Sequence, residues 1–239
     1  TVNISSVAAG FADVRVRFRY FSVVGIHAAD AGCDYAWMVD DVAFVTLPEN
    51  EIIMNFAYTS TTGTGEEYGR IPTAQMPASM NLGAEIFNFG SSEQTNVTVN
   101  CTVAGPTPFS TAIPLLDPHA SGTIPFNDTA TADMDFTLPG ALGLGIYNAT
   151  FTLTSDQVAL DANPADNVRL RNFEVTQDIY SVDAIGNYPE GVEELAQTGT
   201  ASFEDNAEGV KLKNMFINCT HMEATGLQIA LGSETAVGH

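Results

Sequence analysis

Hydrophobic and polar residues alternate with a period of two along most of the chain, and helical periodicity is nearly absent. In residues 13–21 the valines and aromatic residues share one face and three arginines share the other. Residues 96–103 alternate as cleanly, with three valines and Cys101 on one face. This pattern is typical of half-buried β-strands, so the sequence predicts an all-β fold.

Turn residues divide the middle of the chain into short strands. Residues 70–77 read as an extended segment that two prolines keep out of any central strand. About seven strands over roughly 125 residues match an Ig-like, fibronectin-like β-sandwich better than any helical class. The strands are predicted at residues 52–58, 82–89, 96–103, 121–125, 133–138, 145–153 and 168–175.

Domain boundaries are predicted where polar clusters and proline interrupt the strands. Pro48-Glu49-Asn50-Glu51 ends one apolar run, and Ile52 opens the next. From the order of elements, residues 1–47 are predicted to be the C-terminal part of a jelly-roll module. Residues 48–178 are predicted to form the Ig-like sandwich, and residues 179–239 the N-terminal part of a further jelly-roll-like module.

The charge balance narrows the classes of partner. The chain has 8 Lys+Arg against 29 Asp+Glu, a formal net charge of −21, and 45% hydrophobic residues. That apolar content suffices for real cores, so the acidity indicates a solvated surface that suits high-salt or calcium-containing surroundings. Nucleic acid and anionic membranes are not expected as partners. The sequence shows neither a signal peptide nor an apolar run long enough to span a membrane.

Two residue types in the strands have more than one interpretation. The three cysteines, Cys33, Cys101 and Cys219, are too few for a disulfide scaffold; one bridge at most is possible, and a small buried hydrophobe is the simpler role. Tyr147, after Gly145-Ile146, fits a corner tyrosine whose hydroxyl caps a loop. An ordinary cross-strand aromatic explains it equally well.

Short motifs give a more specific resemblance. Val-Arg-Val-Arg-Phe at 14–18 and Trp-Met-Val-Asp-Asp-Val at 37–42 resemble the end of MAM-like and cleaved-adhesin jelly-roll modules in secreted Bacteroidetes proteins. Phe-Asn-Phe-Gly at 87–90 and Asn-Pro-Ala-Asp-Asn at 163–167 resemble CARDB-like modules of the same proteins, with Asn167 alone where a doublet is usual. The resemblance implies an extracellular or cell-surface protein without catalytic activity, exported by type IX secretion.

Asp40 and Asp41 are the first candidates for metal ligands. Neighbours in a strand point to opposite faces, so one carboxylate would need a partner away from solvent. In the jelly rolls that this segment resembles, a carboxylate of the closing strand contributes to a structural Ca²⁺ site, which favours Asp41 and then Asp40. The alternative is pairing with strand arginines or backbone amides.

A second oxygen-rich turn holds Asp161, Asn163, Asp166 and Asn167. Asp and Asn are also ordinary turn residues, and the segment lacks the glycine and closing glutamate of an EF-hand loop. Thr129 follows Asp128 in a pattern that resembles the Bacteroidetes O-glycosylation site. The several Asn-X-Thr sequons would indicate glycosylation in a eukaryote, but Thr-rich strand composition explains them in a bacterium.

No catalytic motif supports an enzyme. The four histidines are far apart, and the sequence contains neither H-E-x-x-H nor G-x-S-x-G. Three functions are therefore considered: a region acting in adhesion, ligand binding or domain spacing, the accessory region of a secreted hydrolase or peptidase, and a self-assembling surface filament. The expected partners are an extracellular or cell-surface glycan or protein, with secretion machinery or self-association as alternatives.

Overall fold

The structure is a computed structural model that describes residues 8, 10, 11, 13–17, 47–60, 69–181, 221 and 223–226. The chain divides into two compact units, Thr1–Leu47 and Pro48–His239. In the first unit, residues 13–17 are exposed and belong to no strand, so the half-buried strand predicted over 13–21 is wrong for this part. Alternation decides which side chains share a face, but a strand also needs a hydrogen-bonded neighbour.

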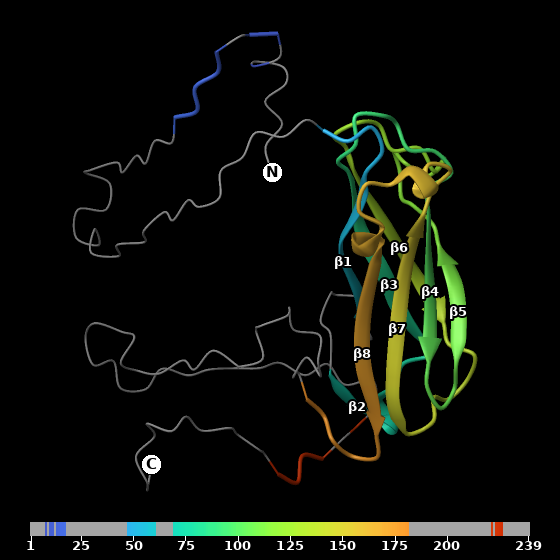
Figure 1. The fold of residues 1–239 in the computed structure, drawn as a ribbon. Coiled ribbons are helices and arrows are strands. Elements are labelled where there is room, and N and C mark those ends of the chain that lie inside the picture. Colours follow the sequence, from blue (N-terminus) through green and yellow to red (C-terminus); the bar gives the residue numbers. More distant parts are fainter. Residues whose placement is uncertain are drawn as a thin grey trace, which may run out of the picture. The chain divides into compact units, whose positions relative to one another are not determined.

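The second unit contains a β-sandwich of eight strands in two sheets (Figure 1). The three-stranded sheet has the order β1 (Ile52–Ser60), β3 (Ser79–Asn88), β6 (Thr129–Thr137). The five-stranded sheet has the order β2 (Arg70–Pro72), β8 (Val168–Thr176), β7 (Gly145–Thr154), β4 (Thr98–Ala104), β5 (Phe109–Ile113). All pairings are antiparallel except β2 with β8. The predicted all-β, Ig-like sandwich is confirmed.

Side chains from the inner faces of both sheets form one core. The predicted apolar face of residues 96–103 is confirmed: its three valines and Cys101 are each at most 3% exposed. Cys101 is free, and burial raises the pKa of its thiol to about 12, which keeps it a neutral, small hydrophobic residue as predicted. Cys33 and Cys219 lie outside the described residues.

Tyr147 is a corner tyrosine as well as a core residue. Its hydroxyl donates to the carbonyl oxygen of Gly143 at 2.9 Å, while its ring is fully buried and stacks on Phe173 with ring centroids 4.9 Å apart. The hydrogen bond ties the loop before β7 to the strand itself. Of the two interpretations that the sequence left open, the loop-capping one is therefore confirmed.

The strand prediction was wrong in two places. Residues 121–125 form a loop with a single bridge between Gln94 and Ile124, and β5 (Phe109–Ile113) was missed. β5 is an edge strand in which only Ile113 is buried, so it lacks a continuous apolar face. Within the predicted extended segment 70–77, the part from Arg70 to Pro72 is an edge strand, as the two prolines of that segment predict.

The connection between β7 and β8 brings the functional candidates together. It contains two short 3₁₀ helices, η2 (Val158–Leu160) and η3 (Pro164–Asn167); a third, η1 (Thr73–Gln75), follows β2. The backbone N–H of Ala162 donates to the carbonyl oxygen of Asn50 at 3.1 Å, which holds this connection against the residues that lead into β1. No helix among the described residues is long and apolar enough to cross a membrane.

Candidate metal centre

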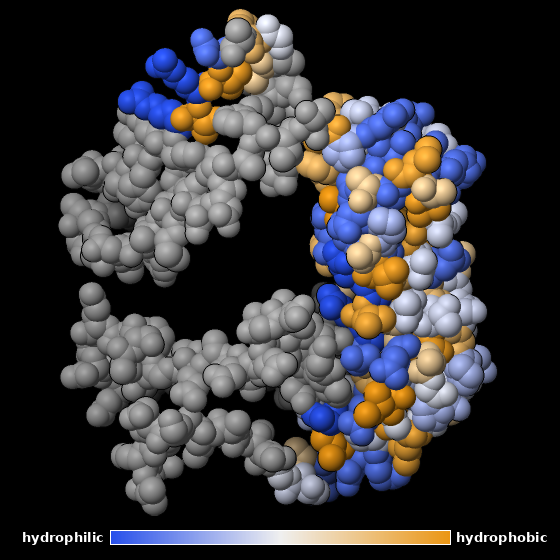
Figure 2. Space-filling view, in the orientation of Figure 1, coloured by the Kyte–Doolittle hydropathy of each residue, from blue (hydrophilic) through white to orange (hydrophobic). Residues whose placement is uncertain are grey.

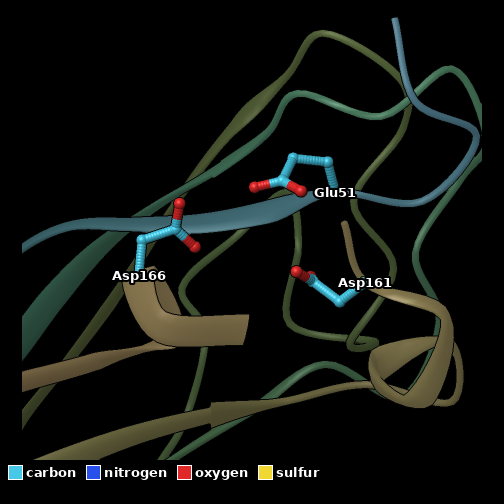
Figure 3. A group of neighbouring side chains, drawn as sticks. All are labelled: Glu51, Asp161 and Asp166. Carbon is cyan, nitrogen blue, oxygen red and sulfur yellow. The ribbon is translucent and has the colours of Figure 1, made fainter. Parts of the chain in front are cut away.

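Three carboxylates meet where the β7–β8 connection contacts the start of β1. Glu51 directly precedes β1, Asp161 follows η2, and Asp166 lies in η3. One oxygen atom from each side chain lies within 4.8 Å of the other two. Figure 3 shows that Glu51 approaches from the β1 segment and the two aspartates from the connection, with their carboxylates turned toward one another.

Hydrogen bonds of the turn hold the two aspartates in place. Asp161 accepts the backbone N–H of Ile52 at 3.1 Å through one oxygen and that of Asn163 at 2.9 Å through the other. The side-chain amide of Asn163 donates to Asp166 at 2.7 Å. The Asp and Asn residues therefore act partly as local turn residues, as the sequence suggested. Each carboxylate oxygen can accept more than one interaction, so a cation can still bind.

The backbone of Glu51 is fixed by the turn after β3. Its carbonyl oxygen accepts the backbone N–H groups of Phe89 and Gly90 at 3.0 and 2.8 Å. The side chain of Asn88 is fully buried; its amide nitrogen lies within 3.1 Å of three carbonyl oxygens, and its oxygen accepts the N–H of Gly90. A Cβ on Gly90 would lie 2.7 Å from the Glu51 nitrogen. The Asn-x-Gly motif thus positions Glu51, one of the three candidate ligands.

Several polar atoms of this site are buried without a hydrogen-bond partner. Glu51 is 4% exposed and its Oε2 is unpartnered, as is Oδ1 of Asp166. Asn167, 3% exposed, has neither its amide oxygen nor its amide nitrogen paired. Leaving a charged group buried without a partner costs about 3 kcal/mol or more, so this arrangement calls for a counter-charge.

The pKa values of the site also show that negative charge is unfavourable there. Burial, followed by the charges of Asp161 and Asp166, raises the pKa of Glu51 to about 7, while the Asn163 backbone N–H opposes this rise. Burial is also the largest cause that raises the pKa of Asp166, against the hydrogen bond from Asn163. The site is therefore unfavourable for three neighbouring anions, and either a proton on Glu51 or a bound cation in its place would relieve this repulsion.

The donor set fits a hard cation. All three groups offer oxygen, which suits Ca²⁺, Mg²⁺ or Mn²⁺ and not the softer metals that prefer thiolate or imidazole. Ca²⁺ binds oxygen at about 2.4 Å, so ligands on opposite sides of the ion lie up to about 4.8 Å apart. The observed separations lie within that limit.

The sequence-predicted sites have different outcomes. The structure brings Asp161 and Asp166 together, whereas Asn163 serves as a hydrogen-bond donor in the turn. Asp40 and Asp41 lie outside the described residues, so their role stays a prediction. Thr129 is exposed at the start of β6, and its backbone N–H donates to Asp128 at 2.8 Å; its glycosylation also stays a prediction.

Glu51 was missed as a candidate ligand. In the sequence it belongs to the polar boundary cluster, 110 positions away from Asp161. Only the long-range contact between the β7–β8 connection and the start of β1 joins the two. Its one local signal is its place directly before an apolar strand.

No model of a known protein family matches the chain, and neither does any protein of curated function. The chain is similar to a CARDB domain from Pyrococcus furiosus solved in complex with di-metal ions, with 10% identity, a TM-score of 0.37, and coverage of 59% of this chain and 100% of that one. It is also similar to an immunoglobulin-like protein from Pseudomonas aeruginosa, with 11% identity, a TM-score of 0.31, and coverage of 54% and 98%. Both likenesses are of low identity and concern the fold alone. The Bacteroidetes origin and the MAM-like modules stay predictions.

Proposed function

We propose that the β-sandwich is a noncatalytic module of an extracellular or cell-surface protein, stabilised by a Ca²⁺ ion bound to Glu51, Asp161 and Asp166. The convergence of three carboxylates, two of which have a buried, unpartnered oxygen atom, carries this proposal. The module would act in adhesion, ligand binding or the spacing of neighbouring domains.

A structural role fits the position of the ion. The ion would join the start of β1 to the β7–β8 connection and so close one end of the sandwich between residues that are far apart in sequence. Glu51 is too buried for easy access of a substrate. Extracellular modules bind Ca²⁺ with dissociation constants of about 10⁻⁴–10⁻³ M, and such a site is filled where free Ca²⁺ is abundant.

The test compares the full 239-residue chain with two variants after removal of divalent ions. Glu51→Gln removes one ligand charge, and Glu93→Gln makes the same change at an exposed glutamate outside the site. Titration calorimetry with CaCl₂ should give binding to the wild type and to Glu93→Gln. Glu51→Gln should lose the binding attributed to this site.

Thermal unfolding gives an independent measure. Ca²⁺ at 100 times its dissociation constant adds about 2.7 kcal/mol, which raises the melting temperature by about 5–10 °C for a unit of this size. This rise should occur in the wild type and in Glu93→Gln but not in Glu51→Gln. Equal melting of the wild type with Ca²⁺ and with chelator would overturn the proposal, and an undiminished rise in Glu51→Gln would overturn the assignment of these residues.

A further inference from the structure

The outer face of the five-stranded sheet is almost free of charge. Among the residues that β4, β5, β7 and β8 turn outward, Glu174 alone is ionisable, and it pairs with Arg70 at 2.9 Å at one corner of the face. The others are Thr98, Asn100, Thr102, Ala104, Ser110, Ala112, Ile146, Asn148, Thr150, Thr152, Thr154, Val168, Leu170 and Asn172. We call these fourteen residues and Glu174 the neutral face.

The composition of the neutral face departs from that of the chain. With 29 acidic residues and a net charge of −21, solvated positions of this protein are expected to carry carboxylates. The outer face of the opposite sheet does so, because Glu85, Asp133 and Asp135 point outward there. Two arginines of β8 also avoid the neutral face: Arg171 lies on the inner side and donates to the carbonyl oxygen of Ala57 on β1, and Arg169 is on the same side of the strand.

Exposed apolar side chains follow one side of the neutral face. Leu170 is 60% exposed, Ile146 is 53% exposed, and Val168 also lies open. Figure 2 views this face and shows apolar residues in an interrupted line over β8 and β7, next to paler residues over β4 and β5. Burial of these side chains would favour association with a partner.

The polar residues of the neutral face can pair with copies of themselves. Threonine hydroxyls and asparagine amides both donate and accept hydrogen bonds, so identical side chains can satisfy one another across a two-fold axis. Thr98 and Thr154 already form such a pair between neighbouring strands, with their hydroxyl oxygens 2.7 Å apart. A partner of the same composition therefore leaves no unpaired buried charge, since Glu174 is already paired with Arg70.

We propose that the neutral face is a self-association surface that packs against the same face of a second copy of this chain. Two copies that each carry a net charge of −21 repel one another over most of their surface, and this face lets them approach without placing carboxylates against carboxylates. The arrangement is isologous, with two sheets stacked face to face.

The size of the neutral face indicates a weak dimer. Four strands about 4.8 Å apart and a longest strand of ten residues give an area of about 19 by 33 Å, or roughly 600 Å². This is below the roughly 800 Å² per partner of a standard stable interface. We therefore expect a dissociation constant of about 10 μM to 1 mM. At low ionic strength the repulsion between the two copies increases, so the dissociation constant should rise.

Sedimentation velocity of the full chain, over concentrations up to about 1 mM, measures this association. The wild type should form dimers that become tighter with added salt. Leu170→Glu should raise the dissociation constant of the dimer at least tenfold. Leu116→Glu is the matched control, since Leu116 is an exposed leucine outside the neutral face and the variant has the same net charge; it should dimerise as the wild type does.

Leu170→Lys separates a specific interface from general charge effects. It makes the chain less acidic, so association governed by net charge alone would become stronger, whereas a neutral interface is disrupted by either sign of charge. We expect Leu170→Lys to weaken the dimer. A wild type that stays monomeric at the highest concentration and in high salt, or equal effects of the substitutions at Leu170 and Leu116, would overturn the proposal.

Discussion

Three carboxylates are gathered at one end of the sandwich, whereas the neutral face has a single carboxylate. At the metal centre, Glu51, Asp161 and Asp166 lie within 4.8 Å of one another and two of the three have a buried, unpartnered oxygen atom. On the neutral face, only Glu174 of the fifteen residues is ionisable, and it is paired with Arg70.

The difference shows how a highly acidic chain can prepare two kinds of interaction. Like charges that are held together and shielded from water are costly unless a proton or a counter-ion binds, so the proposed metal centre would favour a cation. A surface from which charge is largely removed lowers the repulsion against another acidic molecule, so the neutral face would favour a second copy that presents the same face. Both regions depend on where carboxylates are placed, and the following substitutions separate them.

The largest effect is expected from Asn88→Ala, which should disrupt the metal centre and leave the neutral face intact. Asn88 is fully buried, and its loss leaves carbonyl oxygens of the turn without a donor. We expect the free energy of unfolding to fall by about 3 kcal/mol. Urea denaturation measures this loss, and calorimetry on the folded variant should show weaker Ca²⁺ binding.

Asn55→Ala is the control for that substitution. Asn55 is exposed and donates to Glu85 at 2.9 Å across β1 and β3 of the same sheet, so its removal should change the free energy of unfolding by no more than about 0.5 kcal/mol. If Asn88→Ala lowered the free energy of unfolding no more than Asn55→Ala does, the turn after β3 would not be what positions Glu51.

The second largest effect is expected in the pH dependence of folding stability in the absence of divalent ions. The pKa of Glu51 is raised from its ordinary value near 4.5 to about 7 in the folded protein, so the folded state binds a proton more tightly than the unfolded state does. Its contribution to stability is therefore full below about pH 4.5 and is lost as pH rises through about 7. With chelator present, we expect the wild type to lose stability over this range relative to Glu51→Gln.

Urea denaturation at several pH values between about 5 and 8 gives the difference between the two proteins. The raised pKa of Asp166 acts in the same direction and remains in both. Glu93→Gln should follow the wild type throughout. A stability difference between the wild type and Glu51→Gln that does not change with pH would contradict the raised pKa of Glu51.

Much of the sandwich could be predicted from the sequence, because its central strands obey local rules. β4 alternates in full, with Val97 before it and Val99, Cys101 and Val103 within it buried, so period two and the turn at residues 105–108 were enough. β5 follows that turn at a sheet edge, where partial exposure blurs the pattern. Residues 121–125 show the opposite error, since a segment predicted as a strand is a loop with a single bridge.

Less of the metal centre could be predicted, because it depends on long-range contacts. Asp161 and Asp166 were visible as an oxygen-rich turn, but nothing local distinguished a ligand from a turn residue. Glu51 joins them only because Asp161 accepts the N–H of Ile52 across the chain. The neutral face was hidden for the same reason, since its uncharged residues come from four strands and are neighbours only in the sheet.

The smallest effect on folding is expected at the neutral face itself. Thr152→Asp places a carboxylate between Asn100 and Val168, where no other charge lies opposite it. We expect the free energy of unfolding of the monomer to change by less than about 0.5 kcal/mol, since the side chain is on the outer surface of the sheet. Dimerisation in sedimentation velocity should nevertheless be lost, because a carboxylate on the neutral face of each copy would be buried in the interface without a partner.

Thr131→Asp makes the same change on the outer face of the three-stranded sheet, opposite Glu85. There the new carboxylate lies opposite an existing one, so Thr131→Asp should lower the free energy of unfolding more than Thr152→Asp does. It should leave the dissociation constant of the dimer unchanged. Thr131→Asp should therefore lower the stability of the fold and spare the dimer, whereas Thr152→Asp should spare the fold and abolish the dimer. If both substitutions weakened the dimer equally, net charge and not the chemistry of the neutral face would control association.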